Sequence, residues 1–114
     1  MESCLFCRIV EGQSPAKVVY TDDWVVAIED IHPQAQVHLL VIPRRHLPSL
    51  KEATREDEPI LGRLLTVAAQ LARERGLEPR GYRTVINSGA SAGQSVFHLH
   101  VHVLGGRVFR WPPG

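Results

Sequence analysis

The sequence predicts an α+β fold in which an antiparallel sheet packs against one long helix. Two observations carry this prediction: runs of β-branched and aromatic residues occur early and late in the chain, and one long amphipathic segment lies between them. A parallel nucleotide-binding sheet is not expected, because the chain lacks the regular alternation of strands and helices that it requires. With 114 residues, the chain is expected to form a single domain over residues 1–114.

The first part of the chain predicts a short helix, a hairpin and a central strand. Residues Cys7–Glu11 are expected to form the short helix, which the following glycine ends. The runs Lys17–Thr21 and Trp24–Glu29 are joined by two aspartates and predict a hairpin. Val37–Pro43 reads "VHLLVIP" and is apolar enough to lie in the centre of its sheet.

A long helix is predicted after the central strand. Ser49 and Glu52 have the spacing of a capping box, and Pro59 is tolerated only near the start of a helix. From Ile60 onward the apolar residues recur at helical spacing, and Gly76 is a natural C-terminal stop.

Two more strands are predicted, over Tyr82–Asn87 and Val96–Leu104, and the second contains three of the six histidines. Because side chains alternate along a strand, we expect His98, His100 and His102 on one face, about 6.5 to 7 Å apart, and the apolar residues on the other. Three interpretations are open: an ordinary strand with a polar solvent face, a three-histidine zinc site, or imidazoles with different roles around a phosphate group.

The segment that precedes the histidines favours the phosphate interpretation. Asn87–Ser95 reads "NSGASAGQS", and its small and polar residues let backbone N–H groups approach an anion closely. A neutral imidazole can attack phosphorus when an acceptor holds the proton of its other nitrogen. Neighbouring histidines and hydroxyl groups can donate to the phosphate oxygens and to the leaving group, so this scheme needs no metal.

Charge and cysteine content limit the class of protein. With 13 basic and 12 acidic residues the formal net charge is +1, so neither nucleic acid nor a membrane surface is an expected partner. No apolar run approaches the roughly 20 residues that span a bilayer, and the first residues do not resemble a signal peptide, so a cytoplasmic location is expected. Cys4 and Cys7 have a spacing that suggests a metal or redox pair rather than a structural disulfide.

The segment "HLHVHVL" fits the pattern His-φ-His-φ-His-φ-φ, where φ is apolar, and resembles the signature of the histidine triad (HIT) superfamily. The segments "DIHPQAQVHLLVIPRRH", "NSGASAGQSVFHLHVHVLGGR" and "WPPG" resemble its Hint branch, so the resemblance covers nearly the whole chain. It implies a HIT-like fold with a five-stranded antiparallel sheet, one long and one short helix, and a homodimer whose two sheets join. It also implies hydrolysis of the P–N bond of purine nucleoside phosphoramidates such as adenylyl-amines. That reaction proceeds through a covalent nucleotidyl-histidine and releases AMP or GMP, with no cofactor required.

The resemblance also assigns roles to single residues. It implies that His100 is the nucleophile, that His102 binds the α-phosphate, and that His98 helps to orient the ring of His100. Ser95 matches a residue that contacts the phosphate and the scissile nitrogen, and Asp30 matches the carboxylate that binds the ribose hydroxyls. The remaining nucleotide-binding residues that it implies are Phe6, Ile9 and Ile31 around the base, Asn87 and Gly93 at the phosphate, and Trp111, which reaches the partner subunit's site.

The two cysteines depart from animal Hint proteins and resemble bacterial HIT sequences. There the resemblance implies a structural zinc held by Cys4, Cys7, His46 and His98, and two thiolates with two imidazoles suit tetrahedral zinc. The alternative is a reduced, partly buried pair of thiols.

Other functions are compatible with parts of the sequence. Dinucleoside polyphosphate hydrolases of this superfamily usually have Pro-Arg after the triad, where this chain has Gly105-Gly106-Arg107. A non-catalytic nucleotide-binding regulatory module is expected to lack the central histidine or the serine, and both are present. A zinc-dependent hydrolase predicts that a chelator abolishes turnover. Of the other histidines, His38 resembles a supporting residue near the site, and His32 is expected at the surface.

Overall fold

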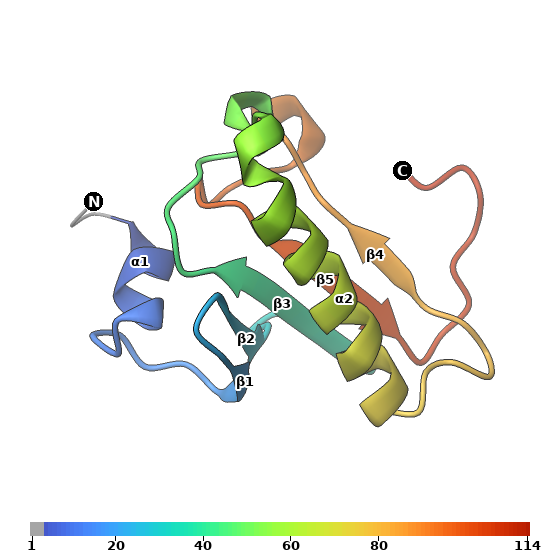
Figure 1. The fold of residues 1–114 in the computed structure, drawn as a ribbon. Helices are drawn as coiled ribbons and strands as arrows, with labels where there is room; N and C mark the ends of the chain where they lie inside the picture. Colours follow the sequence, from blue (N-terminus) through green and yellow to red (C-terminus); the bar gives the residue numbers. More distant parts are fainter. Residues whose placement is uncertain (1–3) are drawn as a thin grey trace.

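The computed structural model describes residues 4–114, which form a five-stranded antiparallel sheet in the order β1-β2-β3-β5-β4 (Figure 1). The strands are β1 (Val18–Thr21), β2 (Val25–Glu29), β3 (Val37–Pro43), β4 (Arg83–Val85) and β5 (Val101–Gly105). The helices are α1 (Leu5–Val10) and α2 (Glu58–Glu74), with single 3-10 turns η1 (Leu50–Glu52), η2 (Arg55–Asp57) and η3 (Ala90–Ala92). The predicted α+β class, the hairpin, the central strand and the long helix are therefore confirmed.

The sheet has a different cover on each face. The helix α2 lies across one face (Figure 1), where its apolar residues pack against alternate residues of the central strands. This main core includes Leu64, Val67, Leu71, Leu39, Val41, Leu99, Val101 and Val103. A smaller cluster on the other face joins α1 to β2 and β3 through Phe6, Ile9, Val26, Ile28, Leu40 and Ile42. Because each fully buried side chain of this size contributes about 1.5–3 kcal/mol, the two clusters fix the position of both helices on the sheet.

The predicted capping box between Ser49 and Glu52 does not form with its reciprocal bonds. The Ser49 side chain accepts from the N–H of Lys51 at 3.3 Å and caps only the short turn η1, and its hydroxyl donates to the Glu52 carboxylate at 2.8 Å. A reciprocal capping box between Thr54 and Asp57 follows. The helix α2 begins immediately after it with Pro59 in its first turn, where a missing N–H costs nothing.

The strand predicted over Val96–Leu104 is shorter than expected and begins only at Val101. The β3 strand, with which it pairs, ends at Pro43, and the last paired residues are Val41 and Val101. Before that point the chain follows the loop after β3 instead, and the N–H of Leu99 donates to the carbonyl of Leu47 at 2.7 Å. The prediction was wrong for the first half of this segment: its pairing with β3 stops at Val41, although β3 continues to Pro43 beside β2, and Leu99 bonds to the following loop instead.

Two other predicted boundaries also move. The first helix was expected to begin at Cys7 but begins at Leu5, because the sulfur of Cys4 caps it by accepting a hydrogen bond from the N–H of Cys7 at 3.3 Å. The strand predicted over Tyr82–Asn87 is reduced to the three residues of β4, which lie opposite the C-terminal half of β5. Both changes leave the order of the elements as predicted.

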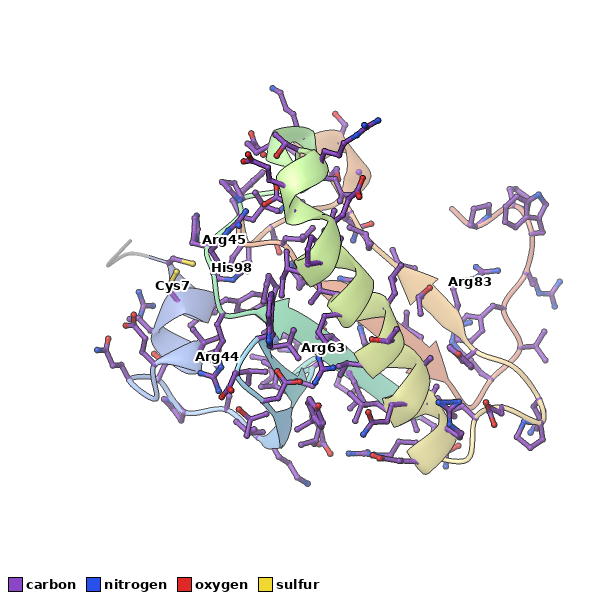
Figure 2. All side chains as sticks on the ribbon, viewed as in Figure 1. Cys7, Arg44, Arg45, Arg63, Arg83 and His98 are labelled. Atoms are coloured by element: carbon purple, nitrogen blue, oxygen red, sulfur yellow. The ribbon has the colours of Figure 1, made fainter. Side chains whose placement is uncertain are left out.

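Side-chain hydrogen bonds attach the β1–β2 hairpin to α2. The carboxylate of Asp22 accepts from the hydroxyl of Tyr20 at 2.7 Å, and from the N–H groups of Trp24 and Val25 at 2.7 and 2.8 Å. Arg63 of α2 donates to the same carboxylate at 2.6 Å (Figure 2). The hairpin is therefore held both to itself and to the helix across the sheet.

The helix α1 is held over the opposite face by Arg44, which follows β3. Its guanidinium group donates to the carbonyl of Val10 at the end of α1 at 3.3 Å, and to the carbonyl of Asp22 at 2.7 Å (Figure 2). In the described part of the chain, no helix is long and apolar enough to cross a membrane.

Candidate functional site

The three clustered histidines lie on the face of the sheet that α1 covers. His98 is fully buried, His100 is 9% exposed and His102 is half-buried. The apolar residues Leu99 and Val101, which alternate with them, pack on the α2 side. The predicted separation of histidines from these apolar residues is confirmed, but the interpretation as an ordinary solvent face is wrong because the imidazoles are enclosed.

The ring of His100 is neutral, with its lone pair on Nε2. Its Nδ1 lies 2.7 Å from the backbone carbonyl oxygen of His98, which can only accept, so Nδ1 carries the proton. Burial lowers the pKa of His100, although the hydrogen bond to this carbonyl and the charge of Asp30 oppose that effect. Phe6 contacts the ring edge-to-face, with centroids 5.0 Å apart. An imidazole held in this way has the form of a nucleophile.

The neighbouring ring of His102 has the opposite tautomer. The N–H of Gln34 donates to Nδ1 of His38 at 3.0 Å, so the proton of His38 is on Nε2. That Nε2 lies 2.9 Å from Nδ1 of His102, which therefore accepts and leaves the proton of His102 on Nε2. Burial, together with the charges of His100 and His38, lowers the pKa of His102 to about 4. With ring centroids 5.0 Å apart, His100 offers a lone pair beside an N–H donor of His102.

The side chains of Asp30, His38 and His102 lie within 4.8 Å of one another and have the ligand types of a metal site. The tautomer of His38 argues against that use. Its Nδ1 already faces an N–H donor, so its Nε2 keeps a proton and donates to His102, with the carboxylate of Asp30 at 3.3 Å. The group is therefore a chain of hydrogen bonds that orients His102.

The loop between β4 and β5 carries the predicted phosphate-binding residues and leads directly into the histidine segment. Gly89 and Gly93 both have positive φ, at 91° and 97°, and a short turn between them reverses the chain. Added at Gly93, a Cβ would meet open space, so the glycine is required for its conformation. Asn87 is half-buried and Ser95 is exposed. Neither of their side chains hydrogen-bonds to any residue that the structure describes.

The predicted base and ribose residues lie in two places: some are buried on α1, and the others are on the loop after β2. Phe6 and Ile9 of α1 are 5% and 8% exposed and belong to the smaller core, whereas Ile31 is 84% exposed on the loop after β2. On the same loop, the carboxylate of Asp30 accepts from the N–H of His32 at 2.8 Å. Trp111 is 82% exposed on the C-terminal segment, which passes beyond β4 on the side away from α1 (Figure 1).

A second cluster, formed by Cys4, Cys7, His46 and His98, has the geometry of a zinc site. All four ligand atoms lie within 4.8 Å of one another. Figure 2 shows Cys7 and His98 close together beside the end of β3, and the separation of Sγ and Nδ1 is 3.5 Å. The two Nδ1 atoms of His46 and His98 are 3.2 Å apart. A tetrahedral zinc ion places its nitrogen and sulfur ligands roughly 3.3–3.8 Å apart, so these residues fit the ion.

The tautomer of His98 supports the same assignment. Its Nε2 lies 2.8 Å from the carbonyl oxygen of Pro43, so the proton is on Nε2 and the lone pair of Nδ1 faces the cysteines. A backbone carbonyl commonly orients a metal-binding imidazole in this way. Burial, together with a hydrogen bond to Cys4, raises the pKa of Cys7 to about 11. A three-histidine zinc site is excluded in the described residues, because the ligand atoms of His98, His100 and His102 do not all lie close enough together to bind one metal ion.

The sequence did not predict the hydrogen-bonding roles of two residues in this region, His38 and Gln94. His38 was expected only to support the site, and its bond to His102 depends on the N–H of Gln34, which no pattern reveals. Gln94 was not predicted at all, although it is the largest side chain between Asn87 and Ser95 and is 5% exposed. A long amide among small loop residues was the available signal.

A cavity also lies elsewhere in the fold. It has a volume of about 620 Å³, lies at the C-terminal end of α2, and is lined by the arginines Arg75, Arg80, Arg83 and Arg107 among others. None of the predicted site residues lines it. A smaller cavity of about 420 Å³ adjoins Cys7 and His46 of the zinc cluster.

Comparisons with known proteins agree with this geometry. The family described as "Scavenger mRNA decapping enzyme C-term binding" matches residues 3–108. A HIT-like protein of Synechocystis sp. is 50% identical over 113 residues, which cover 99% of this chain and 98% of that protein.

Solved structures extend the similarity to the whole fold. A HIT family hydrolase from Legionella pneumophila has a TM-score of 0.97 at 45% identity, covering 98% of this chain and all 100% of that one. A zinc-bound histidine triad family protein from Mycobacterium smegmatis has a TM-score of 0.82 at 36% identity, with coverages of 99% and 85%. A histidine triad nucleotide-binding protein from Candida albicans has a TM-score of 0.83 at 28% identity, with coverages of 98% and 85%.

Proposed function

The chain belongs to the histidine triad (HIT) superfamily, and from that premise we propose that it is a hydrolase that cleaves the P–N bond of purine nucleoside phosphoramidates. The substrate is an adenylyl or guanylyl group bonded to an amine, and the products are the amine and AMP or GMP. The observation that carries the proposal is that His100 and His102 have opposite tautomers: His100 has its proton on Nδ1, and His102 has its proton on Nε2. Their ring centroids are 5.0 Å apart. A nucleophile and a fixed hydrogen-bond donor are the two groups that displacement at phosphorus requires.

In the first step, the lone pair of His100 Nε2 attacks the α-phosphorus. A bond from Nε2 to phosphorus forms while the bond from phosphorus to the amine nitrogen breaks. The hydrogen bond from Nδ1 to the carbonyl of His98 stabilises the positive charge that the ring acquires. The departing nitrogen takes up a proton from water, and the hydroxyl of Ser95, which is exposed at the end of the loop, would donate a hydrogen bond to this nitrogen.

In the second step, the oxygen of a water molecule attacks phosphorus, and the bond from phosphorus to Nε2 breaks. This restores the neutral imidazole and releases one proton, which balances the proton taken up by the amine. Throughout both steps, Nε2–H of His102 donates to a phosphate oxygen, and Asn87 and Gly93 complete the phosphate site. Asp30 binds the ribose hydroxyls, while Phe6, Ile9 and Ile31 contact the base. The low pKa of His102 keeps it neutral near pH 7, so it acts as a fixed donor.

The Cys4, Cys7, His46 and His98 cluster would hold a structural zinc ion. Its four protein ligands leave no position for water or substrate, which is the pattern of structural rather than catalytic zinc. The zinc-bound relative from Mycobacterium smegmatis supports this assignment. Zinc therefore contributes to stability, and no step of the reaction passes through it.

The active unit is proposed to be a homodimer of the Hint type. Strand β4 lies at the edge of the sheet, so a second copy could extend the sheet there. Trp111, which is exposed on the C-terminal segment beyond β4, would then reach the nucleotide site of the partner. The Gly105-Gly106-Arg107 sequence after the histidines also favours this branch over the dinucleoside polyphosphate hydrolases.

The experiment is to incubate the purified protein with adenosine 5′-phosphoramidate and to measure AMP release with and without a chelator. His100→Ala removes the nucleophile, and His32→Ala is the matched control because the imidazole of His32 is exposed and only its backbone N–H bonds to Asp30. We expect AMP from the wild type and from His32→Ala, little effect of the chelator at a temperature where the fold persists, and no turnover by His100→Ala.

Three other results would identify the alternatives. Binding of AMP without turnover of any phosphoramidate would indicate a non-catalytic nucleotide-binding module. Faster turnover of a diadenosine polyphosphate than of the phosphoramidate would indicate the dinucleoside polyphosphate branch. Complete loss of turnover in a folded, metal-free protein would indicate a zinc-dependent hydrolase.

A further inference from the structure

Gln94 is a buried amide inside an otherwise exposed loop. Its neighbours Gly93 and Ser95 are exposed, but Gln94 itself is 5% exposed and points into the protein. A polar side chain of this length is rarely buried unless its hydrogen-bonding groups have partners.

Three hydrogen bonds use both ends of the side-chain amide. Its Oε1 accepts from the N–H of Gly89 at 2.8 Å. Its Nε2 donates to the carbonyl oxygens of Pro48 at 2.7 Å and Val96 at 3.1 Å. The partners define the orientation of the amide, since an N–H can only donate and a carbonyl can only accept. Both Nε2 protons are used, so no donor remains for a substrate.

These bonds connect three separate pieces of backbone. Gly89 lies at the start of the turn in the phosphate loop, and Val96 follows its end. Pro48 lies on the loop after β3, next to Leu47, whose carbonyl accepts from Leu99 in the histidine segment. The amide of Gln94 thus links both ends of the loop between β4 and β5 to the loop after β3. The histidine segment is bonded to the same loop.

The loop needs such a restraint because two glycines form its corners. Gly89 and Gly93 have positive φ and gain more conformational freedom than other residues when released. Within the turn the backbone is closed by local bonds, such as those from the N–H groups of Ala92 and Gln94 to the carbonyl of Gly89 at 3.2 and 3.1 Å. The side chain of Gln94 adds the only side-chain bonds between this turn and the rest of the described chain.

We propose that Gln94 is a positioning residue that holds Asn87 and Ser95 at the spacing required to bind the substrate phosphate, without touching the substrate itself. This inference rests on the proposed function, because it assumes that the loop binds a phosphate group. A displacement of about 1 Å at such a loop can reduce turnover by about a hundredfold, so the restraint affects catalysis as well as folding.

The test compares Gln94→Met with Gln70→Met, a control on α2 whose amide donates to Glu74 one turn along the same helix. Methionine has nearly the shape of glutamine but makes none of its hydrogen bonds. Binding of AMP and of adenosine is measured by calorimetry, and kcat and KM are measured with adenosine 5′-phosphoramidate. For Gln94→Met we expect AMP to bind about tenfold more weakly and kcat to fall at least tenfold, with adenosine affinity unchanged within about twofold. Gln70→Met should match the wild type.

The phosphate-free ligand separates positioning from general damage. Equal weakening of AMP and adenosine, or unchanged AMP affinity and kcat in a less stable protein, would overturn the inference and leave Gln94 with a structural role alone. If the wild type binds no AMP, the proposed function fails and the inference fails with it. If the wild type binds AMP and the variant binds it equally well, only the inference fails.

A measurement on the wild type covers the case in which Gln94→Met does not fold. The side-chain NH₂ protons of Gln94 are followed by NMR. We expect slow exchange with water, because both protons are bonded in a buried site, and a shift on addition of AMP but not of adenosine. Rapid exchange, or equal shifts with both ligands, would overturn the inference.

Discussion

Nδ1 of His100 donates a 2.7 Å hydrogen bond to the backbone carbonyl of His98, whose own ring belongs to the candidate zinc site. One residue therefore takes part in both sites. Its side chain faces the cysteines, and its backbone orients the proposed nucleophile. Movement of His98 when the metal cluster is disrupted should reach the His100 ring through a single hydrogen bond.

The first prediction concerns loss of the metal cluster. His46→Gln removes one ligand that does not contact His100, and His32→Gln is a matched exposed control. We expect His46→Gln to lower bound zinc, to lower the thermal midpoint, and to reduce kcat by about tenfold to a hundredfold, the usual effect of losing an orienting partner. Metal content by mass spectrometry, calorimetry and phosphoramidase kinetics check this. An unchanged kcat in a protein that has lost its zinc would show that the two sites are independent.

The second prediction concerns the tautomer of His102. His38→Leu removes the donor at 2.9 Å from Nδ1 of His102, so the proton of His102 is no longer confined to Nε2. We expect kcat to fall by about tenfold to a hundredfold, as for other partners that orient an active imidazole. His38→Gln should recover part of the loss because its amide can donate. ¹⁵N NMR of the His102 ring reports the tautomer directly, and a single Nε2–H form in His38→Leu would contradict this account.

Much of this site could be predicted because it depends on local periodicity. Alternation on a strand places Leu99 and Val101 on the α2 side and the imidazoles opposite, and the apolar run of β3 has the bounds that its sequence indicates. The cluster of Cys4, Cys7, His46 and His98, expected from the family resemblance, has its ligand atoms within 4.8 Å. These features require only the spacing of residues along elements, or motifs quoted as they stand.

The remaining features depend on contacts between distant segments. The strand β5 begins only at Val101 because the preceding segment bonds to the loop after β3, through Leu99 and Leu47, rather than to β3 itself. The tautomers of His100 and His102 follow from a carbonyl and from the N–H of Gln34, groups that every residue but proline carries. No residue type in the sequence indicates which backbone groups a ring will meet, so these protonation states can be derived only from the fold.

The third prediction concerns acid stability. Burial, with the charges of His100 and His38, lowers the pKa of His102 from 6.5 to about 4. Between these two pH values, His102 is protonated in the unfolded chain but remains neutral in the folded protein. The stability that this neutral imidazole contributes is complete above pH 6.5 and decreases as the pH falls toward 4. One such group changes the free energy of unfolding by at most about 1.4 kcal/mol per pH unit.

Urea unfolding of the wild type and of His102→Asn between pH 7.5 and 4 measures this contribution. We expect a steeper loss of stability with falling pH in the wild type than in the variant. His32→Asn, which removes an exposed imidazole, should keep the wild-type dependence. Parallel curves for the wild type and His102→Asn would show that His102 takes up its proton equally in both states.

The fourth prediction concerns the hairpin carboxylate. Burial alone would raise the pKa of Asp22, but hydrogen bonds from Tyr20, Trp24, Arg63 and Val25 hold it well below its usual range. A depressed carboxylate pKa contributes stability that is present above pH 4 and is lost as the pH falls further. Asp22→Ala removes these bonds at once, and we expect it to lower the free energy of unfolding at pH 7 by about 2–3 kcal/mol.

Asp23→Ala is the matched control, since Asp23 is the adjacent exposed aspartate and makes none of these bonds. Chemical unfolding should give a loss of no more than about 0.5 kcal/mol for this control. Because the hairpin bonds tie β1 and β2 to α2 and include none of the histidines, AMP release by folded Asp22→Ala should equal that of the wild type. Equal stabilities of the two alanine variants would mean that the Asp22 network does not hold the hairpin to the helix, whereas reduced kcat in folded Asp22→Ala would mean that the hairpin also positions the site.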